Sequence, residues 1–227
     1  MKYKSSAFSA ASGSLDGTVF SHNKGGRYVR GRTVPTNPGT PQQTVVRSLM
    51  AQLSNFWVNV LSATARAEWD TYGTIVGATD PLGDQIPLSG LNAYQRSNVP
   101  RMQSGLGRVD VAPVIFDRGE YTLPTFSVQA AGDTVTVAFT STDAWASQVG
   151  SSMLVYASRP VNPSIVYFKG PYRFAGRING AATPPTSPAI IALPFPCATT
   201  QKVFVRVTVS RVDGRLAPPF RGFSIAV

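Results

Sequence analysis

The residue types that most often carry out catalysis are scarce in this chain. The sequence holds one histidine, His22, and one cysteine, Cys197. A Ser/His/Asp triad would have to use His22, which lies in a Gly-rich basic segment, so we expect it to be a polar turn residue. A zinc site needs several Cys or His ligands, and a disulfide within the chain needs two cysteines. Both are excluded, and Cys197 is expected to be an inert thiol.

The carboxylates form no pair suited to acid–base catalysis. Glu68 and Asp70 are two residues apart in a predicted helix and therefore point in different directions. Asp117 and Glu120 fall in a segment that we interpret as a solvated loop. The Gly-Leu-Gly segment at 105–107 lacks the preceding strand and following helix of a nucleotide-binding loop. We expect no catalytic residue, no metal, no cofactor and no enzymatic activity.

Basic residues gather at the two ends of the chain. Of 227 residues, 21 are Lys or Arg and 11 are Asp or Glu, a formal net charge of +10. Residues 1–33 hold six basic residues against Asp16, and residues 113–227 hold ten against five acidic ones. Residues 34–112 hold five of each sign. This excess favours anionic partners such as nucleic acid or an acidic protein surface, or else is simply a basic surface.

Residues 1–40 are predicted to form an extended basic arm that contains a β-hairpin. Their large apolar residues are too few to let the segment fold alone. Residues 19–20 and 28–29 flank turn-forming residues at 23–26. An isolated hairpin is only marginally stable in water, so it should pair with the rest of the chain or with a neighbouring subunit. The side chains expected to bind a partner are Lys24, Arg27, Tyr28, Arg30 and Arg32.

Residues 41–105 are predicted to be a small helical module. Thr40 is a good N-cap for a first helix, and Ser62 for a second helix that ends at Gly77. Almost no loop separates these two helices, which indicates a helical hairpin, and Ser89 begins a third helix. The side chains expected to form the core of the module are Val46, Leu49, Leu53, Trp57, Trp69 and Tyr72.

Residues 120–227 are predicted to be an antiparallel β-sandwich of immunoglobulin or fibronectin-III type. From about residue 125 the apolar period changes from 3.6 to 2, as in the alternating valines of 203–209. Further short apolar runs include 153–156 and 165–168, each expected to be a strand. Many short strands at regular spacing are typical of a sandwich. The fold class is therefore mostly β with a small α module.

A series of short motifs runs through about residues 13–100. The motifs are Gly17-Thr18-Val19-Phe20, Lys24-Gly25-Gly26-Arg27, Asn37-Pro38-Gly39-Thr40, Gln43-Thr44-Val45-Val46-Arg47, Leu53-Ser54-Asn55-Phe56-Trp57, Leu61-Ser62 with Arg66 and Trp69, and Leu88-Ser89-Gly90-Leu91-Asn92-Ala93-Tyr94. In this order they resemble an uncharacterised family encoded in the structural regions of tailed bacteriophages and prophages. The resemblance implies a virion structural protein in which these residues serve the fold.

The arm and this resemblance together favour a non-enzymatic virion structural protein, made in the bacterial host cytoplasm. We expect a capsid-associated decoration or minor capsid protein, anchored by its arm to the major capsid protein and arranged as a homo-oligomer or symmetric array. A tail or neck structural protein is the nearest alternative. No apolar run approaches the roughly 18 residues of a membrane span, so no membrane partner is expected.

Two other functions fit parts of the sequence. A nucleic-acid-binding protein would use Arg27, Arg30 and Arg32, and its binding would weaken steeply with salt. A receptor- or glycan-binding module would expose aromatic side chains on the sandwich loops, with Trp145 and Tyr172 as candidates. The competing interpretation places these two aromatics in the rim or core of the sandwich.

Overall fold

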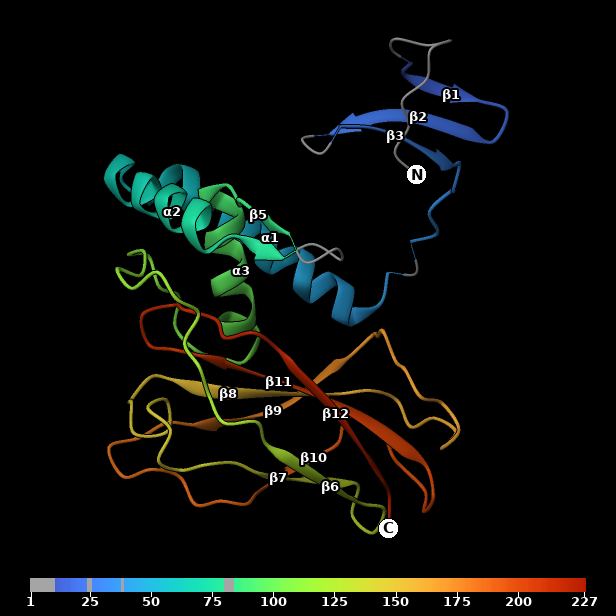
Figure 1. The fold of residues 1–227 in the computed structure, drawn as a ribbon, viewed down its shortest axis with the longest axis vertical. Coiled ribbons are helices and arrows are strands. Elements are labelled where there is room, and N and C mark those ends of the chain that lie inside the picture. The colour runs from blue at the N-terminus through green and yellow to red at the C-terminus, as the bar shows by residue number, and fades with distance from the viewer. Residues whose placement is uncertain (1–10, 24–25, 38, 80–83) are drawn as a thin grey trace. The chain divides into compact units, whose positions relative to one another are not determined.

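The computed structural model describes residues 11–23, 26–37, 39–79 and 84–227 (Figure 1). The chain divides into two compact units, Met1–Pro41 and Gln42–Val227. The predicted fold class is confirmed: antiparallel sheets dominate, and a small group of helices accompanies them. The helical part and the sandwich both lie in the second unit, so their separation into two domains stays a prediction.

The first unit contains a three-stranded antiparallel sheet. Its strands are β1 (Gly13–Leu15), β2 (Thr18–Asn23) and β3 (Gly26–Gly31), in the order β1-β2-β3. Strands β2 and β3 form the predicted hairpin, although residues 24–25 of its turn lie outside the described residues. Strand β1 was not predicted. Asp16 and Gly17 join it to β2 with φ values of 36° and 77°, the positive values that a two-residue hairpin turn requires.

Three helices begin the second unit: α1 (Pro41–Asn59), α2 (Ala63–Val76) and α3 (Gly90–Gln103). The hydroxyl of Ser62 accepts a hydrogen bond from the Ala65 N–H at 3.1 Å, and that of Ser89 accepts one from the Asn92 N–H at 3.4 Å. Gly77 ends α2 with a φ of 52°. These three end signals are therefore confirmed. The short strands β4 (Ala78–Thr79) and β5 (Gln85–Ile86) lie between α2 and α3.

The helices share one apolar core, and α2 packs mainly against α3. Tyr94 of α3 is fully buried at its centre, with ring centroids 5.5 Å from Trp69 and 5.7 Å from Trp57. The helical module is thus held by three helices around an aromatic cluster, to which the third helix contributes a central ring. The buried members are Leu53, Leu61, Trp69, Tyr72, Val76, Ala93, Tyr94 and Ala112.

The β-rich part is a two-sheet sandwich, as predicted. One sheet has the order β10-β7-β6, and the other has the order β12-β11-β8-β9. Valines at alternate positions of β11 meet those of β7 in the core between the sheets. The strands are β6 (Thr125–Gln129), β7 (Thr134–Ala138), β8 (Ser152–Ala157), β9 (Arg173–Asn179), β10 (Ala189–Ala192), β11 (Lys202–Ser210) and β12 (Phe220–Ile225).

The prediction of a strand at residues 165–168 is wrong. This stretch belongs to an irregular loop, residues 159–172, that packs against the four-stranded sheet. The ring of Phe168 stacks 5.5 Å from that of Phe204, and the ammonium of Lys202 donates to the Ile165 carbonyl at 2.9 Å. The apolar run therefore covers the outer face of the sheet and does not extend it.

Buried arginines and the segment after α3 join the helices to the sandwich. Arg101 is 5% exposed and donates to the Ser210 hydroxyl at 3.0 Å and to the Arg211 carbonyl at 2.7 Å. The Trp69 indole donates to the Asp110 carbonyl at 2.8 Å. The connection at 104–124 is therefore tied to the helices at particular points, although apolar side chains along it such as Val114 are exposed. No helix in the described part of the chain has both the length and the apolarity of a membrane span.

Candidate partner-binding surfaces

The arm residues singled out in the sequence lie on a sheet, where alternation divides them between two faces. Arg27 stands opposite His22 in the β2–β3 register, on the same face as Val29. Tyr28 and Arg30 lie on the other face, and Tyr28 is half-buried while the arginines are exposed. Arg32 follows the end of β3 and is exposed, and its backbone N–H donates to the Gly17 carbonyl. Lys24 lies outside the described residues.

This sheet has no core among its described residues. Every residue from 11 to 23 and from 26 to 37 is either half-buried or exposed. The register places Phe20 and Val29 opposite each other on one face, and Leu15 of β1 lies on that face with 73% of its surface exposed. Small sheets become stable only when one face packs against another layer. The arm sheet therefore presents both an apolar face and cationic side chains.

The charges of the arm are not neutralised within the described structure. Arg27, Arg30 and Arg32 form no ion pair with a described carboxylate, and Asp16 is the only acidic residue of the first forty. Exposed guanidinium groups with no internal partner can pair with carboxylates or phosphates of another molecule. The arm can bind an anionic surface through side chains on both of its faces.

The side chains predicted for the helical core differ in burial. Leu53 and Trp69 are fully buried, Tyr72 is 5% exposed, and Trp57 packs half-buried against the same cluster. Val46 and Leu49 of α1 are half-buried and lie outside this cluster. The three aromatics are thus occupied by packing within the fold.

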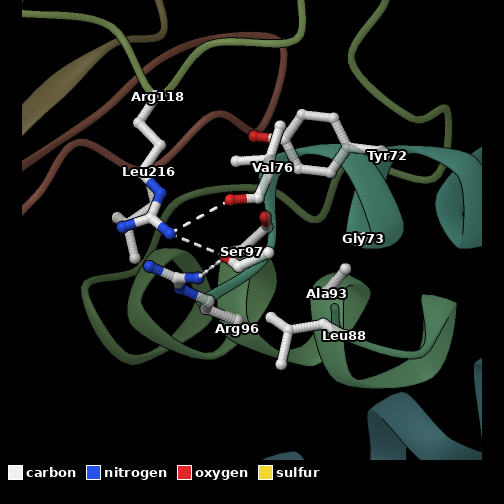
Figure 2. Close-up of a pocket in the computed structure, with 10 residues that line it drawn as sticks. Tyr72, Gly73, Val76, Leu88, Ala93, Arg96, Ser97, Arg118 and Leu216 are labelled. Atoms are coloured by element: carbon white, nitrogen blue, oxygen red, sulfur yellow. Dashed lines mark hydrogen bonds between the residues drawn. The ribbon is translucent and has the colours of Figure 1, made fainter. Parts of the chain in front are cut away.

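Two arginines converge on the end of α2, where a small cavity opens (Figure 2). Arg96 donates to the Gly77 carbonyl at 2.7 Å, and Arg118 donates to the same oxygen at 2.7 Å and to the Val76 carbonyl at 3.1 Å. The last carbonyls of a helix carry partial negative charge and lack helical partners, so they favour cations. Burial, and then the neighbouring Arg118 charge, lower the pKa of Arg96. Because both guanidinium groups are directed at backbone oxygens, this cluster fastens the connection to α2.

The glycan-binding alternative required Trp145 to be exposed, and this prediction is wrong. This side chain is fully buried, its ring lies 5.3 Å from Phe139, and its indole donates to Asp143 at 3.3 Å. Tyr172 is half-buried and its hydroxyl donates to the Phe168 carbonyl at 3.1 Å. The core-or-rim interpretation of both aromatics is confirmed.

The residues with the greatest chemical reactivity lie apart. His22 is exposed on β2, and Cys197 is half-buried in the sandwich. Burial and the nearby Asp133 raise the pKa of the Cys197 thiol, which keeps it protonated and unreactive. Within the described residues, no group of three or more His, Cys, Asp or Glu side chains could hold a metal ion.

Comparisons with known proteins supply a single weak likeness here. No protein-family model matches the chain. No curated protein matches it either. Among solved structures, the adhesin domain of Epf from Streptococcus pyogenes is similar at 12% identity, over 48% of this chain and 33% of that chain, with a TM-score of 0.33. The match spans about a third of that neighbour's length, and a likeness of this strength carries no argument about function.

Proposed function

We propose that this chain is a non-enzymatic structural protein of a tailed-bacteriophage virion, specifically a capsid-associated decoration or minor capsid protein held by its N-terminal arm. The observation that carries the proposal is the arm sheet, whose described residues include no buried side chain and three arginines without a described carboxylate partner. The resemblance of residues 13–100 to virion structural proteins supports the same function.

The arm has two means of attachment. In the described sheet, β1 and β3 are edge strands, and an edge can pair its backbone with a strand of another subunit. The arginines add ion pairs with an acidic surface. Exposed ion pairs contribute about 0.5 kcal/mol each, so one arm binds weakly. Many copies on a symmetric particle make such contacts effective through multivalency.

Nucleic-acid binding is the second candidate, and one observation favours it. Tyr28 and Arg30 lie on the same face of the arm sheet, which suits base stacking beside a phosphate contact. Arg27 lies on the opposite face, so the three arginines do not form one continuous track along a backbone. This division supports contact with surfaces on both sides of the sheet, as expected for an arm between subunits.

The test measures copies of the chain per particle in the phage that encodes it. Particles carrying the wild-type chain are compared with particles carrying Arg27→Ala/Arg30→Ala/Arg32→Ala, by quantitative mass spectrometry of purified virions. Three lost contacts of about 0.5 kcal/mol predict about tenfold weaker binding of each copy. A matched control, Arg66→Ala/Arg159→Ala/Lys169→Ala, removes the same charge from the second unit and should leave the copy number unchanged.

The copy numbers of the wild-type chain and of the two variants distinguish the possible functions. Loss of the arm variant from particles, with the control retained, supports anchoring by the arm. Absence of the wild-type chain from particles overturns the virion role, and equal retention of both variants overturns the arm mechanism. If the wild-type chain is lost from particles that have been emptied of their genome, the arm binds nucleic acid and not a virion protein. Cryo-electron microscopy density of residues 11–37 over a capsid, neck or tail subunit identifies the partner.

A further inference from the structure

The outer face of the four-stranded sheet carries a cationic and aromatic row. The strand registers place Arg221 of β12 opposite Arg206 of β11, Arg206 opposite Tyr156 of β8, and Tyr156 opposite Phe174 of β9. Residues directly opposite in antiparallel strands share a face. The inner face of the same strands holds the valines of the sandwich core. This row is therefore a surface feature, separate from the core.

Two elements cover parts of this face, and a groove opens beside the helical one. At one side the Arg177 guanidinium on β9 donates to the Ser104 carbonyl after α3 at 2.6 Å. At the other, the loop of residues 159–172 stacks Phe168 on Phe204. A groove of about 520 Å³, open to solvent along one side, lies at the row between α3 and β11, within the size range of ligand sites. Among the residues that line it are Met50, Asn92, Val99, Tyr156, Arg206 and Pro219.

Arg206 lies in this groove without a hydrogen-bond acceptor. Its guanidinium carbon is 4.4 Å from the ring centroid of Tyr156 and 5.3 Å from that of Tyr172. No described oxygen accepts a hydrogen bond from this guanidinium, and its Nε is buried without a partner. A guanidinium has five N–H donors, and a buried donor left unpaired is unfavourable. The two rings orient the group, and its hydrogen-bonding capacity remains unused.

Arg206 differs from three other arginines of this unit. Arg211 also has a buried Nε without a partner, but its guanidinium donates to the Glu120 carbonyl at 3.1 Å. Arg215 pairs with Asp213 at 2.7 Å and with Asp117 at 2.6 Å. Arg101 is buried but donates to carbonyl and hydroxyl oxygens. Arg206, in contrast, faces the like charge of Arg221 across the strand pair, an arrangement that destabilises a sheet. Burial and that neighbouring charge lower the pKa of Arg206, while the rings of Tyr156 and Tyr172 oppose this.

The walls of the groove indicate what kind of molecule complements Arg206. Met50, Val99 and Leu216 offer apolar contact, and the half-buried Arg206 offers positive charge. The side-chain amide of Asn92 lines the same groove and can hydrogen-bond a peptide backbone. Arg96 also lines the groove, but it donates to the Gly77 carbonyl, so Arg206 is the cation left for a ligand. An open groove with such a cation, apolar walls and an amide suits an extended peptide better than a small enclosed ligand.

We propose that this groove binds an acidic segment of a partner polypeptide, with one carboxylate paired to Arg206 and a neighbouring apolar side chain against Met50 and Val99. The carboxylate supplies the acceptors that the guanidinium lacks and offsets the repulsion from Arg221. This inference does not rest on the virion role, because it concerns a different surface and holds for any partner with such a segment.

The test uses the full chain and a random heptapeptide display library. We expect selected peptides to carry Asp or Glu next to an apolar residue. A synthetic peptide from that set should bind at least about tenfold more tightly than the same peptide with Gln or Asn at the acidic position, by calorimetry. Arg206→Met should abolish this preference. Arg159→Met, which removes a cation stacked over Phe195 outside the groove, is the matched control and should retain it.

A second variant and a stability measurement keep the proposal open to refutation. Asn92→Trp places a large ring at an exposed position of the groove wall and should block peptide binding without altering the core. Free Arg206→Met should remain folded, because it loses the contacts of the guanidinium with the rings of Tyr156 and Tyr172 but no hydrogen bond. The proposal is overturned if the selected peptides carry no Asp or Glu, or if Arg206→Met binds the acidic peptide as tightly as the wild type does. It is also overturned if hexanoate binds and no acidic peptide is enriched.

Discussion

Two sheets of this molecule, built from similar alternating sequences, differ in how they are stabilised. The arm sheet β1-β2-β3 has no buried side chain among its described residues, whereas every residue of β8 is buried. In the sandwich, the inner face of β11 packs against the other sheet, and its outer face lies under a loop and near α3. The comparison teaches that strand pairing defines a sheet but a second layer stabilises it.

This difference has a functional consequence. The second unit satisfies most of its described polar groups internally, so residues exposed on its surface can be substituted without loss of the fold. In the arm sheet, Arg27, Arg30 and Arg32 are exposed and form no ion pair with a described carboxylate. We therefore expect substitutions in the two cores of the second unit to change stability, and substitutions in the arm to change binding.

Trp69→Ala should have the largest effect on stability. Trp69 is fully buried, contacts Tyr72 and Tyr94, and donates its indole N–H to Asp110. Removing such a side chain costs about 3–5 kcal/mol, measurable as a lower midpoint of urea unfolding. Val58→Ala on α1, where the side chain is 64% exposed, is the control and should change stability by less than about 0.5 kcal/mol. Equal effects of the two would contradict the assigned core.

Arg101→Met should weaken the joint between the helices and the sandwich. It removes the donors to Gly107, Ser210 and Arg211, and buried acceptors left unpaired predict a loss of about 1–3 kcal/mol. Hydrogen exchange should then show the amides of α2 and those of β11 becoming unprotected at different urea concentrations. A single coincident transition in the variant would show that the two parts do not depend on this arginine for their coupling.

Alkaline pH should destabilise the second unit in part through Tyr72. Burial, and then the charge of Asp213, raise its pKa in the folded state from 10.0 to about 12. The folded state therefore favours the protonated phenol, and this contribution is fully present below pH 10 and lost as the pH rises to about 12. Unfolding free energy measured across this range should fall less steeply in Tyr72→Phe. An unchanged slope would show that the phenol is not protected by the fold.

The arm variant Arg27→Ala/Arg30→Ala/Arg32→Ala should have the smallest effect on stability. These side chains are exposed and lie in the first unit, so the unfolding free energy of the second unit should change by less than about 0.5 kcal/mol. Thermal unfolding followed by Trp145 fluorescence measures it. If the unfolding free energy of the second unit fell by more than about 1 kcal/mol, the arm arginines would contribute to its stability, which contradicts the contrast between the two sheets.

Local signals in the sequence were sufficient for much of the fold. The hydroxyls of Ser62 and Ser89 and the positive φ of Gly77 set the ends of two helices, because these are properties of a few neighbouring residues. The alternating valines of 203–209 predicted β11 for the same reason. The Asp-Gly turn before β2 was an equally local signal that went unused, and it explains the unpredicted β1.

The candidate sites depended on contacts between distant residues. Residues 19–20 and 28–29 predicted a hairpin, but the faces to which Arg27 and Arg30 belong follow from its exact register. The apolar run at 165–168 has the composition of a strand, yet it packs on Phe204 because the neighbouring edge positions are already defined by β9 and β12. Composition gives a segment's preference for burial and does not give the surface that buries it.

Composition, periodicity and end signals act over a few residues, and they were enough to predict a basic, mostly β chain with a small helical part and an N-terminal arm. The burial of Trp145, the central place of Tyr94 in the helical cluster and the position of Arg206 in a groove without an acceptor emerged from the folded structure. Burial and hydrogen-bond satisfaction are set by residues far apart in the chain, and these two properties define where a partner can bind.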